Sequence, residues 1–172
     1  MVRAMGQTVR QIVPEPIEAG TWAPFGWIPV DDTDPTDGDH VLEYAWGDPH
    51  VNRIAHRRDE VPQIPGGLRC QELFRHATHT QVLMPLDERS VVVVAPAGCT
   101  MTAPGDADQV RAFLLEPLSA VVLHRGTWHW GPFPVDAPSV TLFNVQGRRY
   151  IEDNDRIDLL DTGVPLDVVL AT

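Results

Sequence analysis

The stretch Glu72-Leu-Phe-Arg-His-Ala-Thr-His-Thr-Gln-Val-Leu-Met-Pro85 alternates polar and apolar side chains, and so does His124-Arg-Gly-Thr-Trp-His-Trp130. Alternation of this kind is typical of half-buried strands. A hydrophobic run lies between the two stretches, which together hold four of the seven histidines. We therefore expect polar side chains from two strands to converge on one cavity, as they do in a small β-barrel.

The length and composition indicate one globular domain that is mainly β. A chain of 172 residues with 43% hydrophobic residues can build one good core and is short for two. Sixteen prolines and thirteen glycines divide the sequence into short segments, which favours strands over long helices. We expect a single domain over residues 1–172, with a core at about 22–146 and a C-terminal extension at 147–172.

Regularly spaced short strands predict a sandwich or barrel. A helix is expected at 106–115, because acidic residues open it and three apolar residues share one face, and a shorter helix at 156–160. Residues 31–39 form an acidic, turn-rich loop, to which we assign no function. An entry segment at 22–30 leads into the strands, which are expected at 40–46, 51–56, 68–75, 79–84, 90–95, 119–124 and 139–145.

The net charge and the basic residues limit the kinds of ligand and reaction that we expect. The net charge of −11 opposes binding to nucleic acid or to an anionic membrane, which leaves a small polar substrate. All thirteen basic residues are arginines, since the sequence contains no lysine. A lysine Schiff base is therefore excluded, and arginine is the natural partner for a substrate carboxylate.

The two cysteines and the character of the N-terminal segment predict a reducing compartment. Cys70 and Cys99 lack metal-type spacing and lie in strand-like contexts, so we expect free, structural thiols. The N-terminal segment does not resemble a signal peptide, and no apolar stretch is long enough to cross a bilayer. These features predict a cytoplasmic protein.

The segment Gly126-Thr-Trp-His129 resembles the second sequence motif of cupins, in which glycine makes a tight turn and histidine points into the barrel. Most of residues 22–145 more specifically resembles the ureidoglycolate lyase family, a branch of the cupins. The resemblance rests on the order and spacing of several pieces: Arg75-His-x-x-x-x-Gln-x-x-x-Pro85, Val91-Val-Val-Val-Ala-Pro96, Arg111-Ala-Phe113 and His124-Arg-Gly-x-Trp-His129, with weaker matches at Ala23-Pro-Phe-Gly26 and Val51-Asn-Arg53.

This resemblance implies a cupin-like β-barrel, a double-stranded β-helix with one or two short helices, assembled as a homodimer. It also implies a carbon–nitrogen lyase of the amidine-lyase type. The family cleaves (S)-ureidoglycolate to glyoxylate and urea, in the pathway that recovers purine nitrogen through allantoin.

The reaction suggests roles for the residues of the two stretches. Cleavage requires that the substrate hydroxyl lose a proton and the departing nitrogen gain one, so His76, His129 and His124 are candidates for these transfers and Gln81 for a hydrogen bond to the ureido group or hydroxyl. The candidates for binding the substrate are Arg75, which holds the carboxylate in this hypothesis, with Arg53, Arg125 and Trp128.

Structural roles are the alternatives for several of these side chains. Arg75 could pair only with Glu72, Trp128 could simply pack, and His124 could cap a turn. His79 could point inward or outward depending on a bulge. The remaining histidines, His40, His50 and His56, have no partner motif and are interpreted as structural or surface residues.

A metal is a second possibility that the sequence leaves open. Metal-binding cupins offer two histidines and a glutamate in the first motif, where this chain has Phe74, His76 and Gln81. A divalent metal (Ni, Zn, Mn or Fe) would be held weakly by His76, Gln81 and His129, because an amide oxygen is a poor ligand. The alternatives are a metal-dependent isomerase, decarboxylase or dioxygenase on another small acid, and a non-catalytic cupin that binds a small acid.

Overall fold

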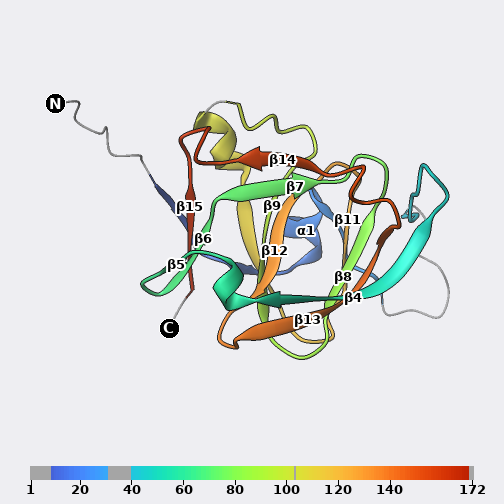
Figure 1. Ribbon diagram of the computed structural model, residues 1–172, viewed down its shortest axis with the longest axis horizontal. Helices are drawn as coiled ribbons and strands as arrows, with labels where there is room; N and C mark the ends of the chain where they lie inside the picture. Colours follow the sequence, from blue (N-terminus) through green and yellow to red (C-terminus); the bar gives the residue numbers. More distant parts are fainter. Residues whose placement is uncertain (1–8, 31–39, 103, 171–172) are drawn as a thin grey trace.

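The computed structural model describes residues 9–30, 40–102 and 104–170, and these residues form mainly β-strands (Figure 1). The acidic loop expected at 31–39 lies outside the described residues. The strands belong to three sheets. None of the described helices is long and apolar enough to span a membrane.

Neighbouring strands in each sheet often come from distant parts of the chain. The first sheet runs in the order β1 (Arg10–Ile12), β15 (Leu166–Val169), β6 (Gly67–Cys70) and β5 (Gln63–Ile64). The second runs in the order β14 (Asp155–Asp158), β7 (Glu72–Arg75), β12 (Trp128–Pro134), β9 (Ser90–Ala95), β10 (Arg111–Leu115) and β2 (Glu15–Pro16). The third runs in the order β3 (Gly26–Trp27), β11 (Val121–Leu123), β8 (Gln81–Pro85), β13 (Ser139–Gly147) and β4 (Pro49–Arg57).

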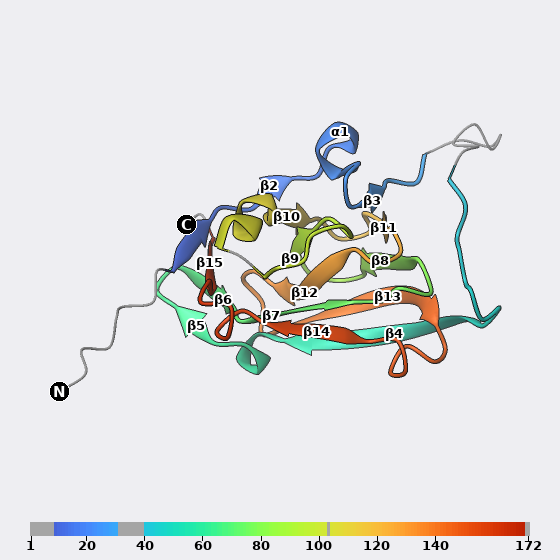
Figure 2. The ribbon, with the colours of Figure 1, turned by 90° about the horizontal axis from the view of Figure 1, so that it is seen from above.

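The predicted mainly β, cupin-like fold is confirmed, although the described strands form a sandwich of sheets and not a closed barrel. Figure 1 shows β9 and β12 between the edge formed by β7 and β14 and the edge formed by β4 and β13. In Figure 2 the short helix α1 (Ala19–Trp22) lies on the side of the molecule opposite β4. Short 3₁₀ turns follow β4 at Arg58–Glu60 and precede β10 at Pro104–Gln109.

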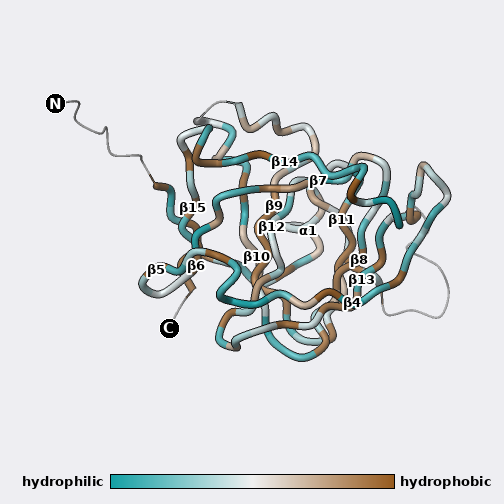
Figure 3. Tube along the Cα trace, viewed as in Figure 1, coloured by the Kyte–Doolittle hydropathy of each residue, from teal (hydrophilic) through white to brown (hydrophobic). Residues whose placement is uncertain are grey.

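The hydrophobic run at β9 forms the centre of the core. All six of its residues are buried. Because successive side chains of a strand point to opposite faces, Val91 and Val93 pack in one apolar cluster while Val92 and Val94 pack in another. A strand that is buried on both faces has a continuous apolar sequence, and Figure 3 shows hydrophobic colour concentrated along the central strands.

The prediction of a helix at 106–115 is wrong for most of that range, because only a 3₁₀ turn at Pro104–Gln109 is helical and the strand β10 follows it. Residues Arg111–Leu115 pair with β9 along their whole length, and the Phe113 ring meets the ring of Trp22 edge-on at a centroid distance of 5.2 Å. The apolar pattern suits a helix and a strand equally well, and pairing with the central strand decides for the strand. The expected helix at 156–160 is also wrong, because Asp155–Asp158 pair with β7.

Two predicted strands differ from the structure. Residues 68–75 divide at Gln71 into β6 and β7, which belong to different sheets. Residues 40–46 make only an isolated bridge between Tyr44 and His79. Both cysteines are free and buried, as predicted.

Candidate active site

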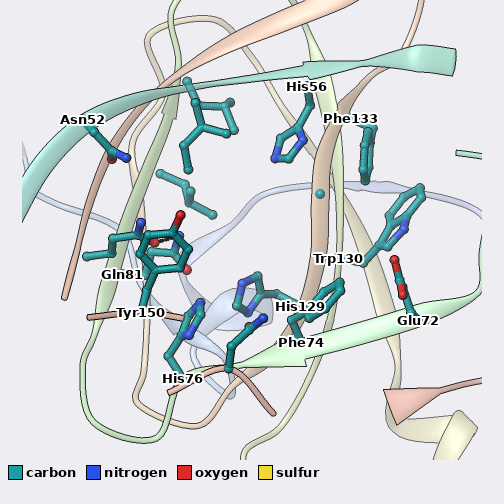
Figure 4. Close-up of a pocket in the computed structure, with 16 residues that line it drawn as sticks. Asn52, His56, Glu72, Phe74, His76, Gln81, His129, Trp130, Phe133 and Tyr150 are labelled. Atoms are coloured by element: carbon teal, nitrogen blue, oxygen red, sulfur yellow. Dashed lines mark hydrogen bonds between the residues drawn. The ribbon is translucent and has the colours of Figure 1, made fainter. Parts of the chain in front are cut away.

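A cavity of about 320 Å³ lies between the second and third sheets. Strands β7 and β12 form one wall, strands β4, β8 and β13 the other, and loop residues complete it (Figure 4). The lining residues are Asn52, Ile54, His56, Glu72, Phe74, His76, Gln81, Leu83, His129, Trp130, Gly131, Phe133, Leu142, Gln146, Tyr150 and Asn154.

The two sequence stretches meet at this cavity, as predicted. The backbone N–H of Gly126 donates to the carbonyl of His76 at 2.7 Å, which joins the turn before β12 to the loop after β7. Gly126 has a φ of +77°, a conformation that favours glycine. This turn leads into β12, so that His129 and His76 lie with their ring centroids 5.4 Å apart.

Backbone carbonyls determine the tautomers of these two histidines. Nδ1 of His76 lies 2.5 Å from the carbonyl oxygen of Asp153, and Nδ1 of His129 lies 3.2 Å from that of Thr127. A carbonyl only accepts, so each Nδ1 carries the proton and donates it. When the rings are neutral, each Nε2 is left with a free lone pair, which suits a base or a metal ligand.

Burial keeps both rings neutral. Desolvation lowers the pKa of His129 to about 3, with a further contribution from the neighbouring His76. Desolvation also lowers the pKa of His76, against the opposing effect of its hydrogen bond to Asp153. At neutral pH the cavity therefore holds two adjacent, uncharged imidazoles.

Asp153 organises the loop that carries His76. Its carboxylate accepts hydrogen bonds from the backbone N–H groups of Ala77 at 2.9 Å and Thr78 at 2.7 Å, and from the Thr78 hydroxyl at 2.5 Å. These bonds keep the pKa of Asp153 below its usual value although burial opposes this. Because its own carbonyl accepts from His76, Asp153 positions both the loop and the ring.

His79 points inward but lies behind His76. It is buried, and its ring stacks on the His76 ring with centroids 4.7 Å apart. Burial lowers the pKa of His79 to about 4. A Cβ at Gly147 would lie 2.7 Å from Nδ1 of His79, so only glycine fits there. His79 therefore supports the site from outside the cavity.

The third-sheet wall of the cavity is polar at one end and apolar at the other. Strand pairing sets Asn144 opposite Asn52, and Leu142 opposite Ile54. The Gln81 side chain donates to Oδ1 of Asn144 at 2.8 Å, and the Asn144 amide donates to Oδ1 of Asn52 at 2.7 Å. The wall thus carries a row of hydrogen-bonded carboxamides beside an aliphatic surface.

Comparison with known proteins agrees with this geometry. The family model described as ureidoglycolate lyase matches residues 9–162. The chain belongs to the ureidoglycolate lyase family. A relative named ureidoglycolate lyase from Pseudomonas savastanoi pv. phaseolicola is 30% identical over 135 residues, which cover 70% of this chain and 74% of the relative. A protein of the same name from Pseudomonas syringae pv. tomato is 28% identical over 172 residues, covering 88% and 96% of the two chains.

In this member of the family, the cavity contains only part of the predicted set. His76, Gln81 and His129 line it together. His124 lies beside the ring of Trp27 instead, at a centroid distance of 5.5 Å. Trp128 is buried in the core and donates its indole N–H to the carbonyl of Cys99.

The three predicted arginines lie outside the cavity lining. Arg75 pairs with Asp155 on the neighbouring strand at 2.9 Å and lies over the Trp128 ring. Arg53 is exposed on β4, on the opposite face from Asn52, because residues of a strand alternate. Arg125 is exposed and donates to the carbonyl of Ala77.

Replacing Arg75 with alanine is accordingly expected to change the KM for substrate less than about threefold. The substitution removes a partly exposed ion pair, whose contribution to stability is about 0–1 kcal/mol. Steady-state kinetics would check this. A KM increase of about tenfold or more, with folding intact, would restore Arg75 as the carboxylate partner.

The donor set does not fit a tightly held metal. Among the described residues, no three His, Cys, Asp or Glu side chains are grouped so that they could hold an ion. His76 and His129 offer two imidazoles, and the third atom available is Oε1 of Gln81, a weak neutral ligand. Proton transfer by the side chains themselves is the chemistry that these residues support directly.

Several residues of the site were not predicted from the sequence. Asn52 lies in the weak match Val51-Asn-Arg53 but was given no role, Asn144 lies in no quoted motif, and the two are brought together only through strand pairing. Tyr150 and Asp153 belong to the segment expected to be a C-terminal extension. His56, interpreted as a structural or surface residue, lines the cavity. The alternating polar positions Asn52, Asn144 and Gln146 were a signal for an inward-facing polar patch.

Proposed function

We propose that this protein is a ureidoglycolate lyase that cleaves ureidoglycolate to glyoxylate and urea. The observation that carries the proposal is the pair of uncharged imidazoles, His76 and His129, facing one cavity in a member of this family. The reaction breaks the carbon–nitrogen bond, converts the hydroxyl to a carbonyl and moves one proton from oxygen to nitrogen. It needs neither water nor an oxidant.

The first proton transfer suits either histidine. Nε2 of His76 or His129 has a free lone pair, because Nδ1 of each ring is held by a backbone carbonyl. The ring that lies nearer the substrate hydroxyl takes its proton as the carbon–nitrogen bond breaks.

The second transfer returns this proton to the departing nitrogen. Both imidazoles begin neutral, so the acid is the imidazolium formed in the first transfer. Its acidity is high, because the buried site disfavours a charged ring. Tyr150 lines the cavity and lies edge-on to His76 with centroids 6.5 Å apart, so it is our candidate for a hydrogen bond to the leaving urea.

The apolar end of the cavity supports this chemistry by excluding water. Trp130 and Phe133 are buried, and their ring centroids lie 4.5 Å apart. Water exclusion strengthens the hydrogen bonds made to the substrate at the polar end.

The decisive experiment measures the products formed from racemic ureidoglycolate. We expect urea and glyoxylate in equal amounts above the spontaneous rate, without ammonia, and a rate that a chelator does not change. Ammonia release would indicate hydrolysis of the ureido group instead. A rate abolished by chelator and restored by iron, manganese or nickel would indicate a metal-dependent reaction.

The family resemblance supports a proposal for the pathway and the oligomeric state, and the free cysteines support one for the compartment. We propose that the enzyme acts in the cytoplasm in the recovery of purine nitrogen from allantoin, and that it is a homodimer. Light scattering on the purified protein tests the oligomeric state, and a mass of a single 172-residue chain would overturn that part.

A further inference from the structure

Among the residues that the structure describes, carboxamides line the polar end of the cavity and no arginine does. Asn52, Gln81 and Gln146 line it, and Asn144 is buried behind them. Burying amides is costly unless their hydrogen bonds are made. Here hydrogen bonds connect the four side chains into one network, which offsets the cost of their burial.

The hydrogen bonds give this network one direction. Nε2 of Gln81 donates to Oδ1 of Asn144 at 2.8 Å and to Oε1 of Gln146 at 3.4 Å, and Nδ2 of Asn144 donates to Oδ1 of Asn52 at 2.7 Å. This arrangement leaves Oε1 of Gln81 without a partner among the described residues. The reverse direction would leave two buried N–H groups unpaired, which is less favourable than one unpaired oxygen.

At the cavity, the network therefore ends in side-chain N–H groups that can donate to a ligand. The oxygens of Asn52 and Gln146 are both occupied as acceptors, whereas their NH₂ groups have no hydrogen-bond partner among the residues that the structure describes. Each residue lines the cavity. A pair of free amide N–H groups complements a ligand that presents two acceptor oxygens.

The opposite end of the cavity contains a carboxylate whose charge is paired. Glu72 lines it there and is paired with Arg156 at 2.6 Å. Figure 4 shows Glu72 beside Trp130 on one side, with Asn52, Gln81 and Tyr150 on the other side and His129 between them. The carboxamide end offers the unpaired N–H groups of Asn52 and Gln146 to an anionic group, whereas the opposite end carries the carboxylate of Glu72.

We propose that Asn52 and Gln146 bind the carboxylate of the substrate through their side-chain N–H groups, in place of an arginine, and that Gln81 and Asn144 orient them. This assignment rests on the proposed lyase function and adds to it the residues that recognise the carboxylate of the substrate. It places the carboxylate at the amide end of the cavity. Neutral donors leave the substrate charge in place beside the histidines.

The test uses Asn52→Asp and Gln146→Glu, which replace the donors with acceptors of the same shape. Because a hydrogen bond to a charged group is substantial, KM for ureidoglycolate and the inhibition constant of glyoxylate should each rise about 10-fold to 100-fold, while kcat changes much less. Inhibition by urea should be unaffected. Asn52→Ala, which adds no charge, should raise KM by a smaller factor, about 3-fold to 10-fold.

The matched control is Arg53→Gln, which lies on the same strand as Asn52 but faces outward. Its KM should match that of the wild-type protein. Unchanged KM in Asn52→Asp and Gln146→Glu, or a loss of urea binding instead of glyoxylate binding, would overturn the assignment. Wild-type turnover tests the lyase function separately, and glyoxylate binding can be measured even if turnover fails.

Discussion

Replacing His129 with glutamine is expected to lower kcat for ureidoglycolate by about 100-fold to 10,000-fold, the usual contribution of a general base or acid. Glutamine fills a similar space but supplies no titratable lone pair. The ring that it replaces is buried and lies 5.4 Å from the ring of His76. Because the reaction needs one group to accept and return a proton, KM should change much less than kcat.

His76→Gln should show a comparable loss, whereas His124→Gln is the matched control. His124 belongs to the same sequence stretch as His129 but contacts Trp27 outside the cavity lining. We expect its kcat to stay within about threefold of wild type, because it does not line the cavity. A full loss of turnover in His124→Gln, or full activity in both His76→Gln and His129→Gln, would contradict the proposed proton transfers.

The second large effect concerns stability below pH 6.5. Burial lowers the pKa of His129 to about 3 and of His79 to about 4, against an ordinary value of 6.5. Below pH 6.5 the unfolded chain binds protons that the folded chain does not bind. The free energy of unfolding should therefore fall as the pH falls, by about 1.4 kcal/mol per pH unit for each histidine, until about pH 4.

The buried histidines lower the free energy of unfolding at a higher pH than the carboxylates do. Hydrogen bonds lower the pKa values of Asp87 and Asp153 below 3.8, so the stability that they contribute is lost only at still lower pH. Urea denaturation at about pH 6.5, 5.5 and 4.5 would measure the slope. With two histidines it should approach about 3 kcal/mol per pH unit, a large fraction of the stability of a typical domain.

His129→Gln also tests the origin of this slope. The variant removes one buried titrating ring, so its slope should be smaller by about 1.4 kcal/mol per pH unit. A slope equal to that of the wild type would show that His129 does not resist protonation in the folded state.

Features that depend on local pattern were predictable from the sequence. The apolar run at β9 matched the observed strand because a doubly buried strand needs apolar residues on both faces. His76, Gln81 and His129 were recognisable because two motifs with a fixed spacing carry them. The family followed from the order of such motifs along the chain.

Prediction failed where a pattern suited two structures. Residues 111–115 have an apolar distribution that suits a helix, yet they pair with β9. Arg75 was predicted to bind an anion because the chain has no lysine, and this role stays a prediction; the structure pairs Arg75 with Asp155, which lies 80 residues away in the sequence. Such pairings depend on which strands become neighbours.

Local alternation and motif spacing were thus sufficient for the mainly β class, the two converging motifs and the family. The set of polar groups that face the cavity depends instead on the tertiary fold. The register between β4 and β13 sets Asn52 against Asn144, and the turn after β13 brings Asp153 to His76. A one-residue shift in register would turn these side chains to the other face, so the site depends on pairing between segments far apart in the chain.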